Sequence, residues 1–266
     1  MLRDITIGQY YPTDSLIHRL DPRVKIVGTI VYLVSLCLFD SFYGFGITIA
    51  FLAGIIMLSH VPFRYILRGL KPILFLLFIT MIFNFFLIPG NVVAHFWIFK
   101  ITDAGLYRGL FVGFRLILLI FGSSVVTFTT TPVQMTDGLE RLMKPLTWIK
   151  VPVHDVAMMM SIALRFIPIL LDETDKIIKA QQARGADFES GNVLKRVKAM
   201  VPIFIPLIIS AFRRAFDLAM AMEARCYHGG KGRTKYHPLK YRARDFFAYG
   251  YLALYLAVII LLRRWI

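Results

Sequence analysis

The sequence predicts an all-α integral membrane protein with about five transmembrane helices and long amphipathic helices on the cytoplasmic side. Three observations support this fold class. Hydrophobic residues make up 58% of the 266 residues, which is more than a soluble domain of this length normally carries. Several apolar runs approach the ~20 residues that cross a bilayer. Lys and Arg outnumber Asp and Glu by 31 to 16 and gather in particular connecting segments.

This composition also excludes two other classes of protein. A disordered chain lacks so many apolar residues. Two cysteines, Cys37 and Cys226, are too few for a disulfide scaffold.

Five apolar runs are long enough to span the membrane. The stretch before the first run is polar, and the run is not followed by the small-residue pattern of a cleavage site. We therefore expect it to be a retained helix and not a signal peptide. The five predicted spans are Val24–Phe39, Phe42–Ser59, Pro72–Ile88, Leu106–Thr129 and Phe246–Leu262.

The distribution of basic residues predicts the orientation of these spans. Of the 31 Lys and Arg, 26 fall before the first span or at its edge (Lys25), in the link between the second and third spans, or within 132–244. Cytoplasmic segments carry the excess of Lys and Arg, so the N-terminus and 132–244 are predicted to be cytoplasmic. Five spans then leave Arg263 and Arg264 outside. Either these two arginines are an exception, or one apolar segment within 132–244 also crosses.

The chain thus divides into three predicted parts: a four-span domain at 1–131, a cytoplasmic domain at 132–244 and a final helix at 245–266. In the cytoplasmic part, Thr131-Pro132 suits a helix start, and that helix should stop before Pro145. A second helix is predicted from about Val153 to Gln182 and a third from about Val193 to Arg225, because apolar residues recur there at helical spacing. Three prolines interrupt these two helices: Pro168, Pro202 and Pro206.

Both long helices are predicted to end in the same short pattern. The two ends, Ala183-Arg184-Gly185 and Ala224-Arg225-Cys226, are 41 residues apart. Arginine offers a planar fork of donors that can clamp a carboxylate on a partner. The alternative is an ordinary helix terminus, where the helix dipole favours a cation. The pattern by itself leaves both interpretations open.

One arginine falls deep within a predicted span. A charge within a membrane span often has a function, so Arg115 is a candidate functional residue. The simpler alternative is that backbone carbonyls or Asn84 satisfy it, or that it faces a polar gap.

Catalytic signatures do not occur in the sequence. It has no phosphate-binding P-loop, no His-Glu-x-x-His, no Cys-x-x-Cys and no Gly-x-Ser-x-Gly. The acidic group Asp172, Glu173 and Asp175 fits a solvated helix face. We expect no catalytic residue, no metal site and no cofactor on this chain. Its basic charge follows the membrane topology, which favours contact with anionic lipids and not with nucleic acid.

Several motifs together resemble the T components of energy-coupling factor (ECF) transporters. The segment 14–25, which reads DSLIHRLDPRVK, is similar to the opening signature of that family. The two helix ends resemble its paired Ala-Arg-Gly motifs, with Cys226 in place of the usual Gly. The segments 131–146 and 164–168 also resemble that family, so the resemblance covers nearly the whole chain in order.

This resemblance implies a non-catalytic subunit of an ABC-type importer in the cell membrane of a prokaryote. Two cytoplasmic ATPases, which use ATP and Mg, would dock at Arg184 and Arg225 with their Ala183, Gly185, Ala224 and Cys226 neighbours. Val156–Leu171 and Met200–Ala211 would form a platform beneath a membrane-embedded substrate-binding S component, with the three prolines as flex points. Movement of the S component would take up a micronutrient such as a vitamin.

Two other functions stay open. One is an integral membrane enzyme acting on lipid head groups, with Asp172, Glu173 and Asp175 as the available acidic groups. The other is a stand-alone channel or carrier, for which Arg115 is the one intramembrane charge that qualifies.

Overall fold

The computed structural model describes residues 10–71, 73–89, 92–96, 99–186, 188, 193–230 and 238–265. These residues form two compact units. The membrane unit lies within 8–141 and 239–266, and the helix-pair unit lies within 142–238. The predicted all-α class is confirmed.

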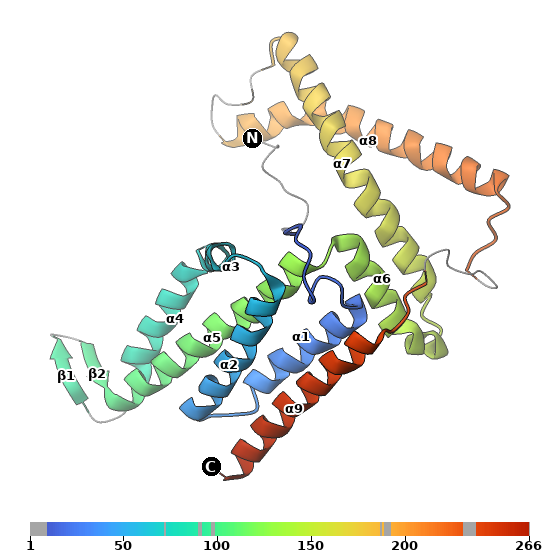
Figure 1. The fold of residues 1–266 in the computed structure, drawn as a ribbon. Helices are drawn as coiled ribbons and strands as arrows, with labels where there is room; N and C mark the ends of the chain where they lie inside the picture. The colour runs from blue at the N-terminus through green and yellow to red at the C-terminus, as the bar shows by residue number, and fades with distance from the viewer. Residues whose placement is uncertain are drawn as a thin grey trace. The chain divides into compact units, whose positions relative to one another are not determined.

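The membrane unit contains seven described helices and a short hairpin (Figure 1). Their order follows the predicted spans, with additional elements between them. The helices are α1 (Pro22–Leu36), α2 (Phe42–Ser59), α3 (Phe63–Leu70), α4 (Leu74–Leu87), α5 (Asp103–Thr129), most of α6 (Pro132–Met143) and α9 (Ala243–Trp265).

A two-stranded antiparallel hairpin links α4 to α5, which the sequence reasoning did not anticipate. Strands β1 (Val92–Phe96) and β2 (Phe99–Thr102) pair Phe96 with Phe99, with an irregular step between Val92 and Ala94. Thr102 then joins the neighbouring helices. Its hydroxyl donates to Ile88 O at 2.7 Å and accepts from Gly105 N at 3.1 Å, capping α5.

By length and composition, four described helices could cross a membrane: α2, α5, α7 and α9. The pair α3–α4, bent by 58°, would be a fifth. Two differences from the predicted spans follow. Helix α1 has 15 residues, about 22 Å at 1.5 Å per residue, which is shorter than the ~30 Å hydrocarbon core. Helix α7, predicted to be cytoplasmic, meets the length and composition requirements.

The link between the second and third predicted spans is also more ordered than expected. It folds as α3, which carries Arg64 and Arg68 and buries Ile66 and Leu70. A charged face and an apolar face on one short helix are typical of a segment at a membrane interface.

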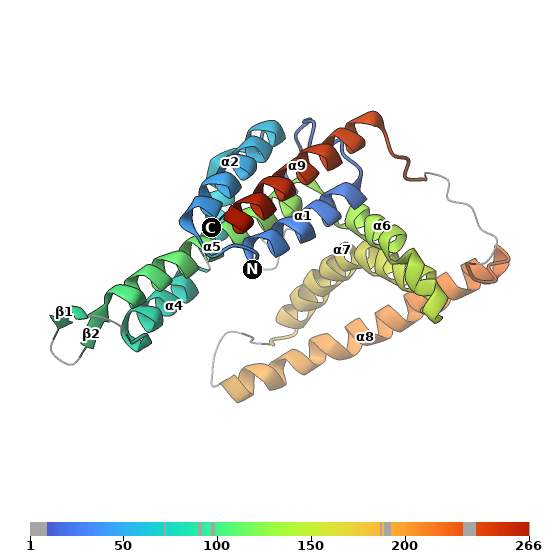
Figure 2. The ribbon, with the colours of Figure 1, turned by 90° about the horizontal axis from the view of Figure 1, so that it is seen from below.

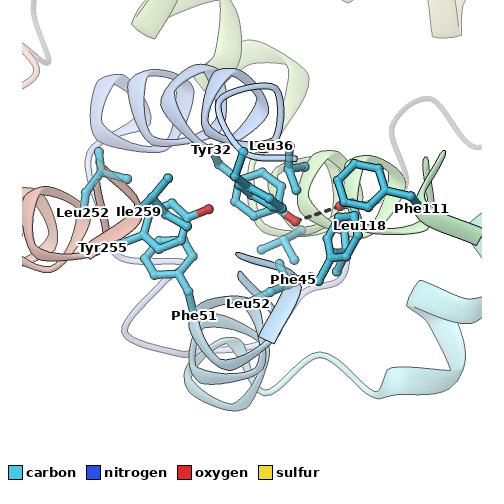
Figure 3. Close-up of a cluster of buried hydrophobic side chains, with 12 residues drawn as sticks. Tyr32, Leu36, Phe45, Phe51, Leu52, Phe111, Leu118, Leu252, Tyr255 and Ile259 are labelled. Atoms are coloured by element: carbon cyan, nitrogen blue, oxygen red, sulfur yellow. Dashed lines mark hydrogen bonds between the residues drawn. The ribbon is translucent and has the colours of Figure 1, made fainter. Parts of the chain in front are cut away.

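The core of the membrane unit lies where α1, α2, α5 and α9 converge (Figures 2 and 3). The Tyr255 hydroxyl of α9 shares hydrogen bonds with Ser35 Oγ at 2.7 Å and Thr48 Oγ1 at 3.3 Å. Its ring stacks on Phe51 with 4.0 Å between centroids. Tyr32 donates to Leu118 O at 2.9 Å. Helices in lipid associate through such packing and hydrogen bonding, because water does not drive apolar surfaces together there.

Close approach of α1 and α5 depends on one glycine. A Cβ at Gly122 would lie 2.1 Å from the ring of Tyr32, well inside van der Waals contact. Small residues at helix interfaces allow this close contact in membranes.

We predict that Gly122→Ala lowers the free energy of unfolding by about 1–3 kcal/mol, because overpacking displaces Tyr32. Gly28→Ala in α1 is the control, since a Cβ there meets nothing within 4 Å. Thermal unfolding of both variants in the same detergent measures the difference. Equal melting temperatures would contradict the packing argument.

The helix-pair unit contains η2 (Lys144–Ile149), α7 (Val153–Ala183) and α8 (Val193–Ala224). Both long helices match their predicted ranges to within one residue at each end. Pro168 lies inside α7, and Pro202 and Pro206 lie inside α8. Figure 1 shows the two helices crossing one another.

Candidate functional site

At the first Ala-Arg end, two backbone hydrogen bonds from the residues after Arg184 terminate α7. Gly185 N donates to Gln182 O at 2.9 Å, and Ala186 N donates to Gln181 O at 3.0 Å. Gly185 has φ +86°. This is the Schellman arrangement, in which a left-handed residue directly after the C-cap satisfies the last carbonyls. Arg184 is the C-cap residue.

The second end has the same geometry, although the left-handed position holds Cys226 instead of glycine. Cys226 N donates to Glu223 O at 2.8 Å, and Tyr227 N donates to Met222 O at 3.1 Å. Cys226 has φ +54°. The departure from the Ala-Arg-Gly pattern therefore leaves the backbone conformation unchanged.

The side chains of these two ends are available to a partner. Ala183, Arg184, Gly185, Ala224, Arg225 and Cys226 are all exposed. Within the part of the chain that the structure describes, neither Arg184 nor Arg225 forms an ion pair. Both guanidinium groups can thus donate hydrogen bonds to a carboxylate from outside the chain.

The two ends lie at opposite ends of the helix pair. Glu173 of α7 and Arg214 of α8 form an ion pair at 2.8 Å, and Gln181 Nε2 donates to Pro202 O at 3.4 Å. As α7 advances, its contacts move back along α8, so the helices are antiparallel. Arg225 lines a cavity of about 330 Å³ together with Met158. Met158 and Arg184 are 26 residues apart on α7, a rise of roughly 40 Å.

An exposed apolar face runs along α8. Its members recur every three or four residues and therefore share one side of the helix. A continuous apolar strip of this kind marks an interaction surface in a protein or a membrane. The exposed residues are Val201, Phe204, Ile205, Ile208, Ile209, Phe212, Phe216 and Met220.

This strip overlaps the predicted platform Met200–Ala211. Of the three predicted flex points, Pro168 and Pro202 are exposed and Pro206 is half-buried. All three lie within continuous helices, so their role as flex points stays a prediction.

The opening signature forms a hydrogen-bonded turn in front of α1. His18 Nδ1 lies 2.7 Å from Ser15 Oγ, and His18 Nε2 lies 3.1 Å from Tyr11 O. Because a carbonyl only accepts, Nε2 donates and Nδ1 accepts from the serine. Burial, with a contribution from the charge of Lys25, lowers the pKa of His18 below its usual value. The turn therefore holds a neutral imidazole.

A second cluster joins the starts of α1 and α9. The Asp245 carboxylate, 1% exposed, accepts from Asp21 N at 2.9 Å and from Arg242 N at 2.7 Å. Asp21 pairs with Arg23 at 2.8 Å, and the Arg23 guanidinium lies 3.8 Å above the ring of Tyr241. Burial raises the pKa of Asp21, but the hydrogen bonds from Arg23 outweigh it and leave that pKa below its usual value.

Sequence reasoning did not single out Asp245. The sequence signal for Asp245 is its place in the first turn of α9, where a negative charge stabilises the start of a helix. Its partner in α1 is 224 residues away.

Arg115 has two partners within the membrane unit, although its buried Nε has none among the described residues. Its guanidinium donates to Phe39 O at 2.6 Å and contacts Asp40 Oδ1 at 3.3 Å. The prediction that a backbone carbonyl is a partner of Arg115 is confirmed. The predicted contact with Asn84 is not among the hydrogen bonds of Arg115 in the described residues, and Asn84 Nδ2 donates to Thr80 O within its own helix.

The acidic group in α7 is only partly engaged by the rest of the chain. Glu173 is engaged by Arg214, and Asp172 is exposed. Across the described ranges, no group of three or more His, Cys, Asp or Glu side chains could hold a metal ion.

Comparison with known proteins identifies the family. The profile of the cobalt transport protein family, CbiQ, matches residues 13–236. The chain belongs to this family. It is 52% identical to the energy-coupling factor transporter transmembrane protein EcfT of Clostridium kluyveri over 267 residues, covering 100% of this chain and 99% of the relative. The EcfT proteins of Thermosediminibacter oceani and Bacillus subtilis are 50% and 45% identical, over 95% and 92% of this chain and 96% and 93% of theirs.

These relatives are named as transmembrane components of transporters, and not as enzymes. The resemblance inferred from the motifs is confirmed.

The left-handed conformation of Cys226 leads to a stability prediction. A non-glycine residue pays about 1 kcal/mol there, so Cys226→Gly should stabilise the end of α8 by about 0.5–1 kcal/mol. Hydrogen exchange at the amides of residues 226 and 227 should slow. The reciprocal Gly185→Cys should speed exchange at 185 and 186. Faster exchange in Cys226→Gly would contradict a strained left-handed conformation at Cys226.

The neutral state of His18 leads to a pH prediction. Because its folded pKa lies below the unfolded value of about 6.5, the unfolded chain takes up the proton first. The contribution of His18 to the free energy of unfolding is fully present above this pH and is lost as the pH falls below it. We expect the melting temperature of the native protein to fall between pH 7.5 and 5.5 more steeply than that of His18→Gln. Parallel curves would show that His18 does not contribute.

Proposed function

We propose that this chain is the non-catalytic transmembrane coupling subunit of an ECF-type ABC importer. In this role it links ATP hydrolysis by two cytoplasmic ATPases to movement of a substrate-binding S component. The imported substrate is a micronutrient such as a vitamin. The observation that carries the proposal is the pair of equivalent Ala-Arg helix ends, exposed at opposite ends of an antiparallel helix pair.

Each ATPase docks on one of these ends. The alanine and the left-handed residue beside each arginine are small, so a partner groove can close around the guanidinium. A carboxylate in that groove receives two parallel hydrogen bonds. Their positions at opposite ends of the helix pair suit two globular partners side by side better than one.

The S component rests on the apolar strip of α8. The strip offers large side chains with no polar group, which suits a partner that is itself membrane-embedded. Pro168, Pro202 and Pro206 allow the two helices to bend as the ATPases close.

The subunit lies in the plasma membrane of a prokaryote with its N-terminus and residues 132–244 on the cytoplasmic side, as its basic residues favour. It binds no cofactor. ATP and Mg belong to the partner ATPases, since this chain has no P-loop.

We predict that Arg184→Glu combined with Arg225→Glu releases both ATPases. Reversing a charge that meets a buried carboxylate costs about 2–5 kcal/mol per site. Affinity purification of the tagged chain from its native membranes, followed by quantification of the co-purifying ATPases, measures the loss.

The matched control is Arg213→Glu, which reverses another exposed arginine on α8 outside the motif. Normal recovery of ATPases with the double variant, or equal loss with the control, would reject docking at the Ala-Arg ends.

A further inference from the structure

The membrane unit contains a half-open cavity of about 420 Å³ between α1, α2, α5 and α9. Its walls are almost entirely apolar and include Val24, Ile55, Val125 and Leu252. A turn of the opening signature adds Leu16, Ile17 and Leu20. The cavity adjoins the core but is distinct from the Ala-Arg ends, which belong to the other unit.

Two cationic side chains, Lys25 and Arg244, also line this cavity. Each belongs to the first turn of its helix, and the contact between Asp21 and Asp245 holds those two helix starts together. From Lys25 the lining continues along α1 through Gly28 and Thr29 to Tyr32, a depth of about 10 Å. The cavity therefore has a charged end and an apolar interior.

Arg244 is not neutralised by the protein around it. Its Nε is buried without a hydrogen-bond partner, and within the described ranges no carboxylate forms an ion pair with it. The nearby Asp245 already accepts two backbone N–H groups, and Asp21 pairs with Arg23. Arg244 as a whole is half-buried, and leaving its buried Nε–H without an acceptor is costly unless an anion from outside the chain supplies one.

Lys25 adds a second positive charge with spare capacity. It is 7% exposed, and its Nζ donates to Thr129 O at 2.8 Å and His18 O at 3.2 Å. An ammonium group has three N–H donors, so one is available beyond these two carbonyls.

We propose that this cavity binds one anionic phospholipid, with its phosphate at Arg244 and Lys25 and an acyl chain between α1 and α9. An amphiphile matches both ends of the cavity, whereas a free phosphate matches only the charged end. The depth of about 10 Å lies within one leaflet of a ~30 Å hydrocarbon core. Basic pockets between transmembrane helices are typical sites for anionic head groups.

Native mass spectrometry of the delipidated full-length chain in mild detergent tests this site. The probes are dioleoylphosphatidylglycerol, dioleoylphosphatidylcholine and the chain-free sn-glycerol 3-phosphate. Arg244→Gln removes the charge. Gly28→Leu fills the cavity from a position where an added Cβ meets nothing within 4 Å. Gly46→Leu, equally unobstructed but on α2 outside the cavity lining, is the matched control.

We expect one phosphatidylglycerol per chain, bound more tightly than phosphatidylcholine. Arg244→Gln should weaken it roughly tenfold or more, since a charged hydrogen bond is lost. Gly28→Leu should weaken it similarly, and Gly46→Leu should leave it unchanged. Glycerol phosphate should not compete at the same concentration.

Three results would overturn the proposal. Equal binding by Gly28→Leu and the native chain places the lipid elsewhere. Full competition by glycerol phosphate indicates an aqueous anion site. If a photoactivatable phosphatidylglycerol labels no peptide of α1 or α9, while a co-purified protein cross-links there, the cavity belongs to a protein partner. Should Arg244→Gln fail to fold, the Gly28→Leu and Gly46→Leu pair still decides.

Discussion

The buried carboxylate of Asp245 constrains the membrane unit more than any other single group. It accepts amide hydrogens from Asp21 and Arg242, so it holds the start of the last helix against the start of the first. Asp21 in turn caps α1 by accepting from Arg23 N at 3.0 Å. Because a buried carboxylate without hydrogen bonds is costly, these two bonds favour the observed register between α1 and α9.

The rest of the core follows from that register. With α9 placed against α1, Tyr255 comes level with Ser35 and Thr48 and completes their hydrogen bonds. Gly122 then allows α5 to approach Tyr32 closely. The same arrangement leaves Lys25 and Arg244 beside one apolar cavity.

Most helices could be predicted from the sequence because their limits are set locally. The range of α2 was predicted to the residue from its apolar run, and Thr131 and Gln134 cap each other at the start of α6 as that segment suggested. The hairpin at 92–102 and helix α3 could not be predicted from apolar-run length, because each is a short, mixed-polarity element. The role of Asp245 depends on a contact 224 residues away, which periodicity and capping cannot reveal.

The candidate docking residues were identified from sequence, but their arrangement was not. The pattern around Arg184 and Arg225 indicated two equivalent helix ends. That Cys226 adopts the left-handed conformation, and that the two ends lie at opposite ends of an antiparallel pair, depends on the packing of α7 against α8. The apolar strip of α8 was partly visible as the segment 200–211, although its extension to Phe216 and Met220 was not.

The ion pair between Glu173 and Arg214 divides the helix pair symmetrically. Arg184 lies eleven residues after Glu173, and Arg225 lies eleven residues after Arg214. Each arm is therefore about 16 Å long. The two arginines therefore lie equally far along their helices from one contact. A chain without an internal sequence repeat thus presents two equivalent helix ends that are symmetric about a single ion pair.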